Sequence, residues 1–424
     1  MRKIALALSL FFIFLLPWEG AVRLPGGGTF ARFAGLAVGA FWLATVLVTG
    51  RMRKLGPFQI MVGVFVLWNA FSVFWSESPY RSFAHVQTWV QMLLLVLILW
   101  DLYTTRFSVL AGLQAYILGA YVAVGSAVYN YFSGQVYYTN NQRFSAGETN
   151  PDGFGFIMAL GIPLAWYLAG SISASGIGRV LRVVNYIYIP AALLGIALSG
   201  TRTALLASVV GMAFGLASLT RLRLAARIAI FVLLASIILV LLPYVQTLES
   251  FQRLGTTGTE LTSGDLNNRT NNWSVGFASF FEHPLLGVGS NMYRSINSLS
   301  KTAEGKVSHN SYLSVLVELG LIGFVIFAII LAMAFIQAWR QPKWQSWFWL
   351  TVLSVWGLGA FTLTWEARKS TWLFLSFVIV SSAITNQRQK AARQKMAAYP
   401  ATRLISPRNQ TQTAITQKER ILAD

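Results

Sequence analysis

The amino-acid sequence predicts an all-α polytopic membrane protein with about twelve transmembrane helices and one long loop between the ninth and the tenth. Two observations predict this class. Of the 424 residues, 55% are hydrophobic and only 11% are charged, whereas soluble globular domains carry roughly 25% charged residues. Uncharged apolar runs also recur along most of the chain, and each is about long enough to cross the hydrocarbon core of a bilayer.

The predicted spans follow one another with mostly short connections. They cover residues 4–18, 33–50, 57–75, 83–100, 107–132, 153–172, 183–199, 203–219, 228–245, 311–337, 344–362 and 371–385. The first span resembles the apolar part of a signal peptide, but the residues that follow, Pro17–Gly20, offer no cleavage site of small residues. We therefore expect the first span to be retained; cleavage would leave eleven spans.

The spans divide the chain into four segments. Residues 1–245 contain spans one to nine, 246–308 form a large outer loop, and 309–385 contain spans ten to twelve. Residues 386–424 form a polar tail with scattered basic residues, which we expect to be disordered because it has too few apolar residues to fold.

The distribution of charge indicates the orientation of the spans. An even number of spans puts both termini on one side, and when that side is the cytoplasm, most basic residues fall on the inner side. This pattern follows the positive-inside rule and accounts for the net charge of +19 without a nucleic-acid partner, while the tail would lie near anionic lipid. The inner basic residues before the tail are Arg2, Lys3, Arg51, Arg53, Lys54, Arg106, Arg179, Arg182, Arg221, Arg223, Arg227, Arg340 and Lys343.

The chain has no cysteine and only three histidines, which lie far apart. These counts exclude a zinc finger, an iron–sulfur protein and a disulfide scaffold. We expect no metal site and no cofactor.

The outer loop contains a predicted amphipathic helix over 270–281. Trp273, Phe277, Phe280 and Phe281 recur at the spacing of one helical face. Such a helix would lie in the headgroup plane or cap a cavity between spans; the alternative is an ordinary packing helix. His283-Pro284 ends it, and the following residues, 285–289, predict a flexible turn.

His309 begins the tenth span on the outer side and is the first candidate for chemistry. On a helix, Tyr312 shares its face, whereas Glu318 lies nine residues further on and therefore opposite. Glu318 is expected to face another partner, either an arginine or a water-filled cavity, because hydrocarbon excludes charge. The alternative for His309 is a structural, hydrogen-bonded side chain at the membrane interface.

Arg202 lies in the short connection 199–203 between the seventh and eighth spans. Small and hydroxyl residues there predict a helix N-terminus that points outward and can meet an anion. The planar guanidinium fork suits a phosphate; the alternative is an arginine that only contacts lipid headgroups. Arg269, at the start of the amphipathic helix, repeats this arrangement, and Arg143 is a weaker third candidate.

Outer acidic residues form a further group, in which Glu148, Asp152 and Glu366 are either bases or residues that keep loops soluble. Their spacing does not decide between these roles.

Arg202, Arg269 and His309 all fall on the outer side. Two arginines and a titratable group suit a lipid-linked pyrophosphate, because the arginines would neutralise its charge as it leaves. The histidine would take a proton from an attacking hydroxyl. Cationic side chains would then do what a divalent ion does in other phosphate chemistry.

Several short motifs resemble the signature of the O-antigen ligase and polymerase superfamily. The set occurs in a fixed order, although each piece alone is weak, and the arginine stretch Ser199–Thr203 resembles the family's other arginine motif. The motifs are Asn268-Arg269 with Trp273, His283–Gly289 (HPLLGVG), His309–Leu313 (HNSYL) and Glu318–Gly323 (ELGLIG).

The resemblance implies a bacterial inner-membrane glycosyltransferase of the GT-C type with a periplasmic active site, independent of metal and nucleotide. Its donor would be a glycan on undecaprenyl pyrophosphate. In the ligase branch the acceptor is the lipid A–core, in the polymerase branch another lipid-linked repeat unit, and in a third branch a protein hydroxyl. By resemblance, Arg202 and Arg269 would bind the pyrophosphate and His309 would be catalytic, with Arg143, Tyr312 and Glu318 as supporting candidates.

A ligase-like transferase is the function that the sequence favours, with the polymerase as the close alternative. A lipid-linked glycan transporter or flippase is the alternative from another class. It would need charged residues along a path through the membrane, whereas only Glu318 lies deep within a predicted span.

Overall fold

A computed structural model describes residues 1–22, 28–136, 142–173, 175–220, 223–248, 250–252, 269–299, 305 and 307–397. In these ranges the chain forms helices joined by loops, and no β-strand occurs. The expectation of a disordered tail is wrong for residues 386–397, which form the last turns of a helix. Asn267, Asn268 and the tail beyond residue 397 lie outside the described residues, so the expected disorder of 398–424 stays a prediction.

The helices match the predicted spans closely. Nine of those in the described part are long and apolar enough to cross a membrane, so the chain is an all-α polytopic membrane protein. Helices α1, α15 and α16 occupy the other three predicted spans, and the total of twelve spans stays a prediction. The helices are α1 (Arg2–Leu15), η1 (Leu16–Trp18), α2 (Phe30–Thr49), α3 (Pro57–Phe71), η2 (Ser72–Phe74), α4 (Pro79–Leu102), α5 (Arg106–Phe132), α6 (Pro151–Ser171), α7 (Ile177–Ser199), α8 (Arg202–Leu219), α9 (Leu224–Gln246), α12 (Arg269–Glu282), α13 (Tyr293–Leu299), α14 (Ser311–Trp339), α15 (Lys343–Ala360) and α16 (Lys369–Ala397).

The chain divides into two compact units, Met1–Ser382 and Ala383–Asp424. The first contains all the helices up to the early turns of α16. The described part of the second is the polar last part of α16, from 383 to 397.

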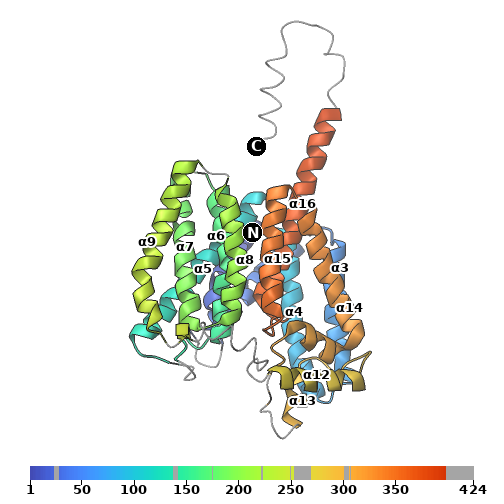
Figure 1. The fold of residues 1–424 in the computed structure, drawn as a ribbon. Helices are drawn as coiled ribbons and strands as arrows, with labels where there is room; N and C mark the ends of the chain where they lie inside the picture. Colours follow the sequence, from blue (N-terminus) through green and yellow to red (C-terminus); the bar gives the residue numbers. More distant parts are fainter. Residues whose placement is uncertain are drawn as a thin grey trace. The chain divides into compact units, whose positions relative to one another are not determined.

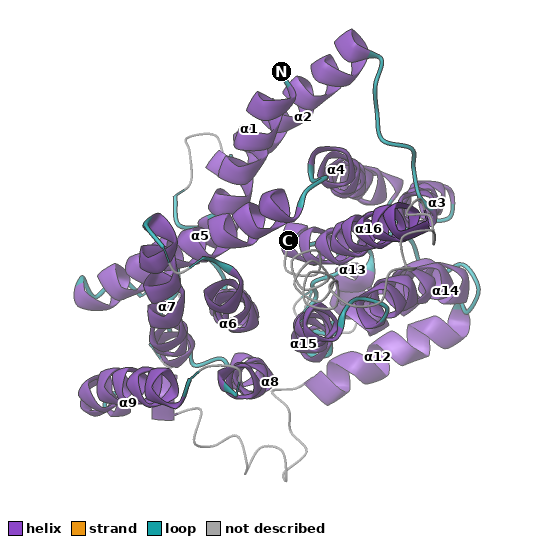
Figure 2. Ribbon diagram, turned by 90° about the horizontal axis from the view of Figure 1, so that it is seen from above, coloured by secondary structure: helices purple, strands orange, loops and turns teal. Residues whose placement is uncertain are grey.

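Helix α6 lies at the centre of the first unit, where it contacts α5, α7, α8 and α15 (Figure 2). In its most apolar stretch 89% of the residues are buried, whereas in that of α9 only 6% are. Small residues allow this close packing, because a Cβ added at Gly161 would lie 2.1 Å from the Tyr188 hydroxyl. The result is a tightly packed central helix whose first turn carries Asp152.

The predicted amphipathic helix is confirmed as α12, which lies crosswise to the long helices at one end of the unit (Figure 1). Its aromatic residues do not share one environment. Trp273 and Phe280 pack against a buried cluster, whereas Phe277 and Phe281 are 46% and 75% exposed. The buried cluster consists of Val288, Met292, Tyr293, Leu313 and Val317.

Helix α14 is interrupted at Gly320, which has a φ of 65° and a non-helical ψ of −170°. The segment 284–289 fills the break through backbone hydrogen bonds. Val288 and Gly289 N–H donate to the carbonyls of residues 317 and 318 at 3.0 and 2.8 Å, and Leu321 N–H donates to Pro284 O at 2.9 Å. The expectation of a flexible turn here is wrong, because a broken helix inside a membrane protein must satisfy its freed backbone groups. The motifs HPLLGVG and ELGLIG are the two halves of this contact.

Candidate active site

A cavity of about 630 Å³ opens where the first turns of several helices meet. It is bordered by the starts of α4, α6 and α13 and by the segments that precede α14 and α16. The residues lining it are Arg81, Asn150, Asp152, Gly153, Asn291, Arg294, Val307, His309, Leu363, Thr364, Trp365 and Arg368.

His309 lines this cavity from a position just before α14. The helix begins at Ser311, and the N-cap Asn310 accepts hydrogen bonds from the N–H groups of residues 312 and 313. His309 has a φ of 49°, in the left-handed region. Residues other than glycine adopt this conformation only when their surroundings hold them there. The placement of His309 on the helix face of Tyr312 is therefore wrong, because His309 precedes the helix.

The loop between α15 and α16 holds His309 in this conformation. The His309 N–H donates to Thr364 Oγ1 at 3.1 Å. The Ser311 hydroxyl donates to the carbonyl of Leu363 at 2.7 Å and accepts from the backbone of the same loop at 2.8 Å. Glu366, in this loop, is 6% exposed and burial raises the pKa of its carboxyl, so it is not a residue that keeps the loop soluble.

Helix α12 supports the same segment from the other side. The Trp273 indole N–H donates to Ser308 O at 2.9 Å, and the Asn272 amide donates to Val307 O at 2.7 Å. Trp273 lies one helical turn after Arg269. Its bond to Ser308 therefore fixes the first turn of α12, which carries Arg269, beside the backbone that precedes His309.

Asp152 and Arg143 form an ion pair at 2.5 Å, and their side chains are 23% and 11% exposed. Arg143 also donates to Ser199 O at 2.6 Å and to Thr201 Oγ1 at 3.1 Å. Arg143 therefore ties the start of α6 to the turn that precedes α8.

Arg202 is the first residue of α8 and is half-buried. The turn before it needs Gly200, which has a φ of 59°. In the described part of the chain, the hydroxyl of the N-cap residue Thr201 does not bond to the helix but donates to Pro151 O at 3.0 Å. The first N–H groups of α8 are therefore left without a side-chain cap.

These charged residues lie close enough for their charges to act on one another. Asp152 interacts electrostatically with Arg143, Arg269 and His309. Burial lowers the pKa of the Arg269 guanidinium, the Asp152 carboxylate raises it, and Arg143 and Arg202 lower it. The charges of Arg269 and His309 thus act on Asp152, and that of Arg202 acts on Arg269, although these residues are distant in sequence.

Two of the supporting candidates lie elsewhere. The Tyr312 hydroxyl donates to Gly357 O at 3.3 Å on α15. The Glu318 carboxylate accepts from the backbone N–H groups of Asn291 and Tyr293 at 2.7 and 3.2 Å. Its expected arginine partner is therefore wrong, because backbone amides at the start of α13 satisfy it.

Sequence reasoning missed three arginines that line the cavity, Arg81, Arg294 and Arg368. They lie at the starts of three separate helices, and no local motif marks them. They make the cavity wall strongly cationic.

Comparison with known proteins agrees with this geometry. Residues 187–328 match the family described as O-antigen ligase. The resemblance to the O-antigen ligase family is confirmed. Over 334 residues the chain is also 26% identical to the exopolysaccharide production protein ExoQ of Rhizobium meliloti (strain 1021), with 72% of each chain covered. The region that matches the O-antigen ligase family runs from α7 into α14 and includes Arg202, Arg269 and His309, which indicates a ligase- or polymerase-type role in polysaccharide biosynthesis.

Proposed function

We propose that this protein is a GT-C-type glycosyltransferase that moves a glycan from undecaprenyl pyrophosphate to an acceptor hydroxyl on the periplasmic side of the bacterial inner membrane. The observation that carries this proposal is the group of interacting charges in which Arg269 and His309 act on Asp152 and Arg202 acts on Arg269. Asp152 and His309 line the cavity of about 630 Å³. A lipid-linked donor explains why such a site lies in a membrane protein, since the lipid enters between helices while its sugars stay in water.

The two arginines are the proposed pyrophosphate ligands. Arg202 stands at the first turn of α8, where backbone N–H groups and the helix dipole favour an anion. Arg269 adds a second guanidinium, and both can form bidentate bonds to phosphate oxygens. Together they would stabilise the negative charge that develops as the pyrophosphate leaves.

His309 is the proposed general base. It would take the proton of the acceptor hydroxyl while the acceptor oxygen bonds to the anomeric carbon and the bond from that carbon to the pyrophosphate oxygen breaks. This direct displacement inverts the anomeric configuration. The Asp152 carboxylate would stabilise the imidazolium ion that forms, and Arg143 fixes Asp152 in place.

The first proposed acceptor is the lipid A–core, which makes the protein a ligase. The second is another lipid-linked repeat unit, which makes it a polymerase. The similarity to a protein of exopolysaccharide production over 72% of the chain favours this second possibility.

The test is a transfer assay with purified protein in lipid nanodiscs and a fluorescent lipid-linked oligosaccharide donor, with and without the lipid A–core. Wild type should form a new glycosidic bond, and Arg269→Ala and His309→Ala should each lose it while folding normally, since each removes a group acting on the reacting atoms. Movement of the donor across a membrane without bond formation would indicate a transporter, and near-wild-type transfer by both variants would refute the site.

A further inference from the structure

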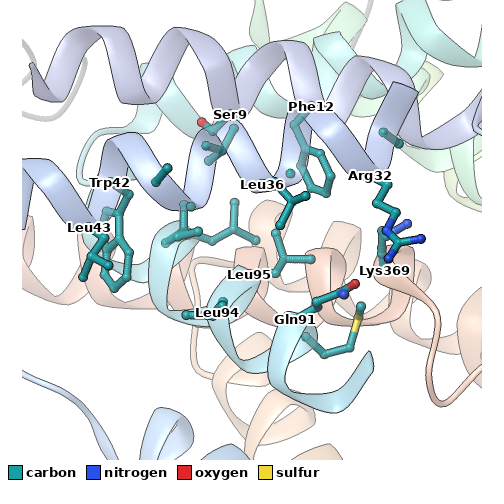
Figure 3. A pocket seen from close by; sticks show the side chains of 18 residues that line it. Ser9, Phe12, Arg32, Leu36, Trp42, Leu43, Gln91, Leu94, Leu95 and Lys369 are labelled. Carbon is teal, nitrogen blue, oxygen red and sulfur yellow. The ribbon is translucent and has the colours of Figure 1, made fainter. Parts of the chain in front are cut away.

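A second, apolar groove lies between α1, α2 and α4, with a volume of about 370 Å³. Its walls are almost entirely hydrocarbon, from residues such as Phe12, Leu36, Trp42 and Leu95 (Figure 3). Arg32 and Lys369 stand together at one end, whereas Trp42 lies at the other. The groove is therefore long, apolar and cationic at one end only.

Small residues of α2 create this space. A Cβ added at Gly39, which lines the groove, would meet no atom within 4 Å, and one added at Gly35 would approach only the Phe12 ring, at 3.0 Å. Only 22% of the apolar stretch of α2 is buried. Because α2 is otherwise in contact with lipid, a chain from the bilayer can reach the groove.

The cationic end lies on the same side of the unit as the candidate active site. Arg368, which lines the active-site cavity, directly precedes Lys369. The Glu148 N–H donates to Gly20 O at 3.2 Å, which joins the loop beside the groove to the segment before α6. A headgroup at this end would therefore be close to the part of the cavity wall that Arg368 forms.

The charges at this end suit a phosphate. Lys369 pairs with Glu19, which also accepts a hydrogen bond from Thr29 at 3.0 Å. Arg32, in the first turn of α2, is exposed and adds a guanidinium fork beside the ammonium group. Two cations and one carboxylate leave an excess of one positive charge.

We propose that this groove binds one long hydrocarbon chain of a lipid whose phosphate headgroup lies at Arg32 and Lys369, namely a polyprenyl phosphate or diphosphate. With a volume of about 370 Å³ and cations at one end only, the groove suits a lipid with one chain and one headgroup better than a lipid with several acyl chains. Arg202 and Arg269, on α8 and α12, would hold the donor. The inference therefore rests on the polymerase form of the proposed function, in which the acceptor is a lipid-linked repeat unit, and it assigns this groove to the carrier lipid of that acceptor.

Photocrosslinking tests the groove independently of transfer activity. The probe is a polyprenyl phosphate with a diazirine near the end of its chain, added to the full-length protein in nanodiscs, and crosslinked peptides are identified by mass spectrometry. Crosslinks should fall on α1, α2 and α4. Gly39→Phe should weaken them about tenfold or more, because its ring would fill the space that the chain occupies. A tenfold loss corresponds to about 1.4 kcal/mol, which lies within the usual cost of overpacking such a space.

Gly63→Phe is the matched control, because a Cβ at Gly63 on α3 also meets no atom within 4 Å and Gly63 does not line the groove. It should leave the crosslinks unchanged, and Arg32→Gln should weaken them severalfold. The proposal is overturned when the groove peptides stay unlabelled, when Gly39→Phe has no effect, or when phosphatidylglycerol or inorganic phosphate competes as well as unlabelled polyprenyl phosphate.

The two proposals fail separately. Loss of groove labelling with intact transfer in wild type would refute only the groove. Full transfer by the Arg269→Ala and His309→Ala variants, with groove labelling retained, would refute only the proposed site.

Discussion

Thr364→Val removes the hydrogen bond that positions His309, together with the one between the hydroxyls of Thr364 and Ser308 at 3.2 Å. Valine keeps nearly the size and shape of threonine but removes the hydroxyl that accepts from the His309 N–H at 3.1 Å. The imidazole itself and the arginines remain in place. The variant therefore tests whether glycan transfer requires the left-handed backbone conformation of His309, with its φ of 49°.

The size of the effect follows from the lost hydrogen bond. An N–H group that loses its acceptor at a partly buried position costs about 1–3 kcal/mol. The left-handed backbone costs about 1–2 kcal/mol in wild type and variant alike, and without the hydrogen bond it favours relaxation of His309 away from the cavity. We expect kcat to fall about 5–150-fold, since each tenfold corresponds to about 1.4 kcal/mol, with little change in the KM for the donor.

The assay is steady-state transfer across a range of pH, together with the melting temperature. The pH profile of Thr364→Val should keep its shape at a lower maximum, and Thr364→Ser should recover most of the activity because it keeps the hydroxyl. Thr351→Val, at a threonine whose hydroxyl donates within α15, should behave as wild type. Wild-type kcat in Thr364→Val, or a loss that Thr364→Ser does not recover, would refute this role.

Three further predictions concern the site and its support. Arg202→Lys should lower kcat/KM at least about tenfold, because a lysine cannot make a bidentate contact; full activity in the transfer assay would show that charge alone suffices. Gly320→Ala should destabilise the protein by about 2–4 kcal/mol, because its Cβ would lie 2.2 Å from a backbone oxygen at a φ of 65°, whereas Gly63→Ala, in open space, should be neutral in thermal unfolding. Burial raises the pKa of Glu366 in the folded protein, so the unfolded chain loses this proton at a lower pH than the folded one. The free energy of unfolding therefore falls as the pH rises from about 4.3, the usual pKa of a glutamate, through the raised pKa. Glu366→Gln should remove this contribution, so the melting temperature of the variant should gain on wild type as the pH rises from 4 to 8; parallel curves would contradict it.

The helices were predictable because each depends on a pattern within its own segment of the chain. A span needs only a run of apolar residues, and α12 needs only an aromatic pattern with a proline after it, so neither depends on distant contacts. The break in α14 was not predictable in this way. Gly320 marks it, but its partner, the 284–289 segment, lies more than thirty residues earlier, and only their pairing shows why both motifs are rich in glycine.

The site was predictable in part. Arg202, Arg269 and His309 stood in recognisable motifs, and the structure brings them together. Of the two surroundings expected for Glu318, an arginine or a water-filled cavity, the arginine was wrong. The backbone N–H groups of Asn291 and Tyr293 bind its carboxylate, and only packing brings them near. Arg81, Arg294 and Arg368 were missed since each belongs to a different helix and becomes a neighbour of His309 only through packing.

The chain alone determined that this is a helical membrane protein and which residue types suit a phosphate-bearing lipid, because hydrophobic length and side-chain chemistry are local properties. Packing decided where those side chains point. The left-handed His309, the Arg143–Asp152 pair that ties α6 to α8, and the groove beside α2 all depend on contacts between segments far apart in sequence. Such contacts depend on the order and tilt of the helices, which no single segment encodes.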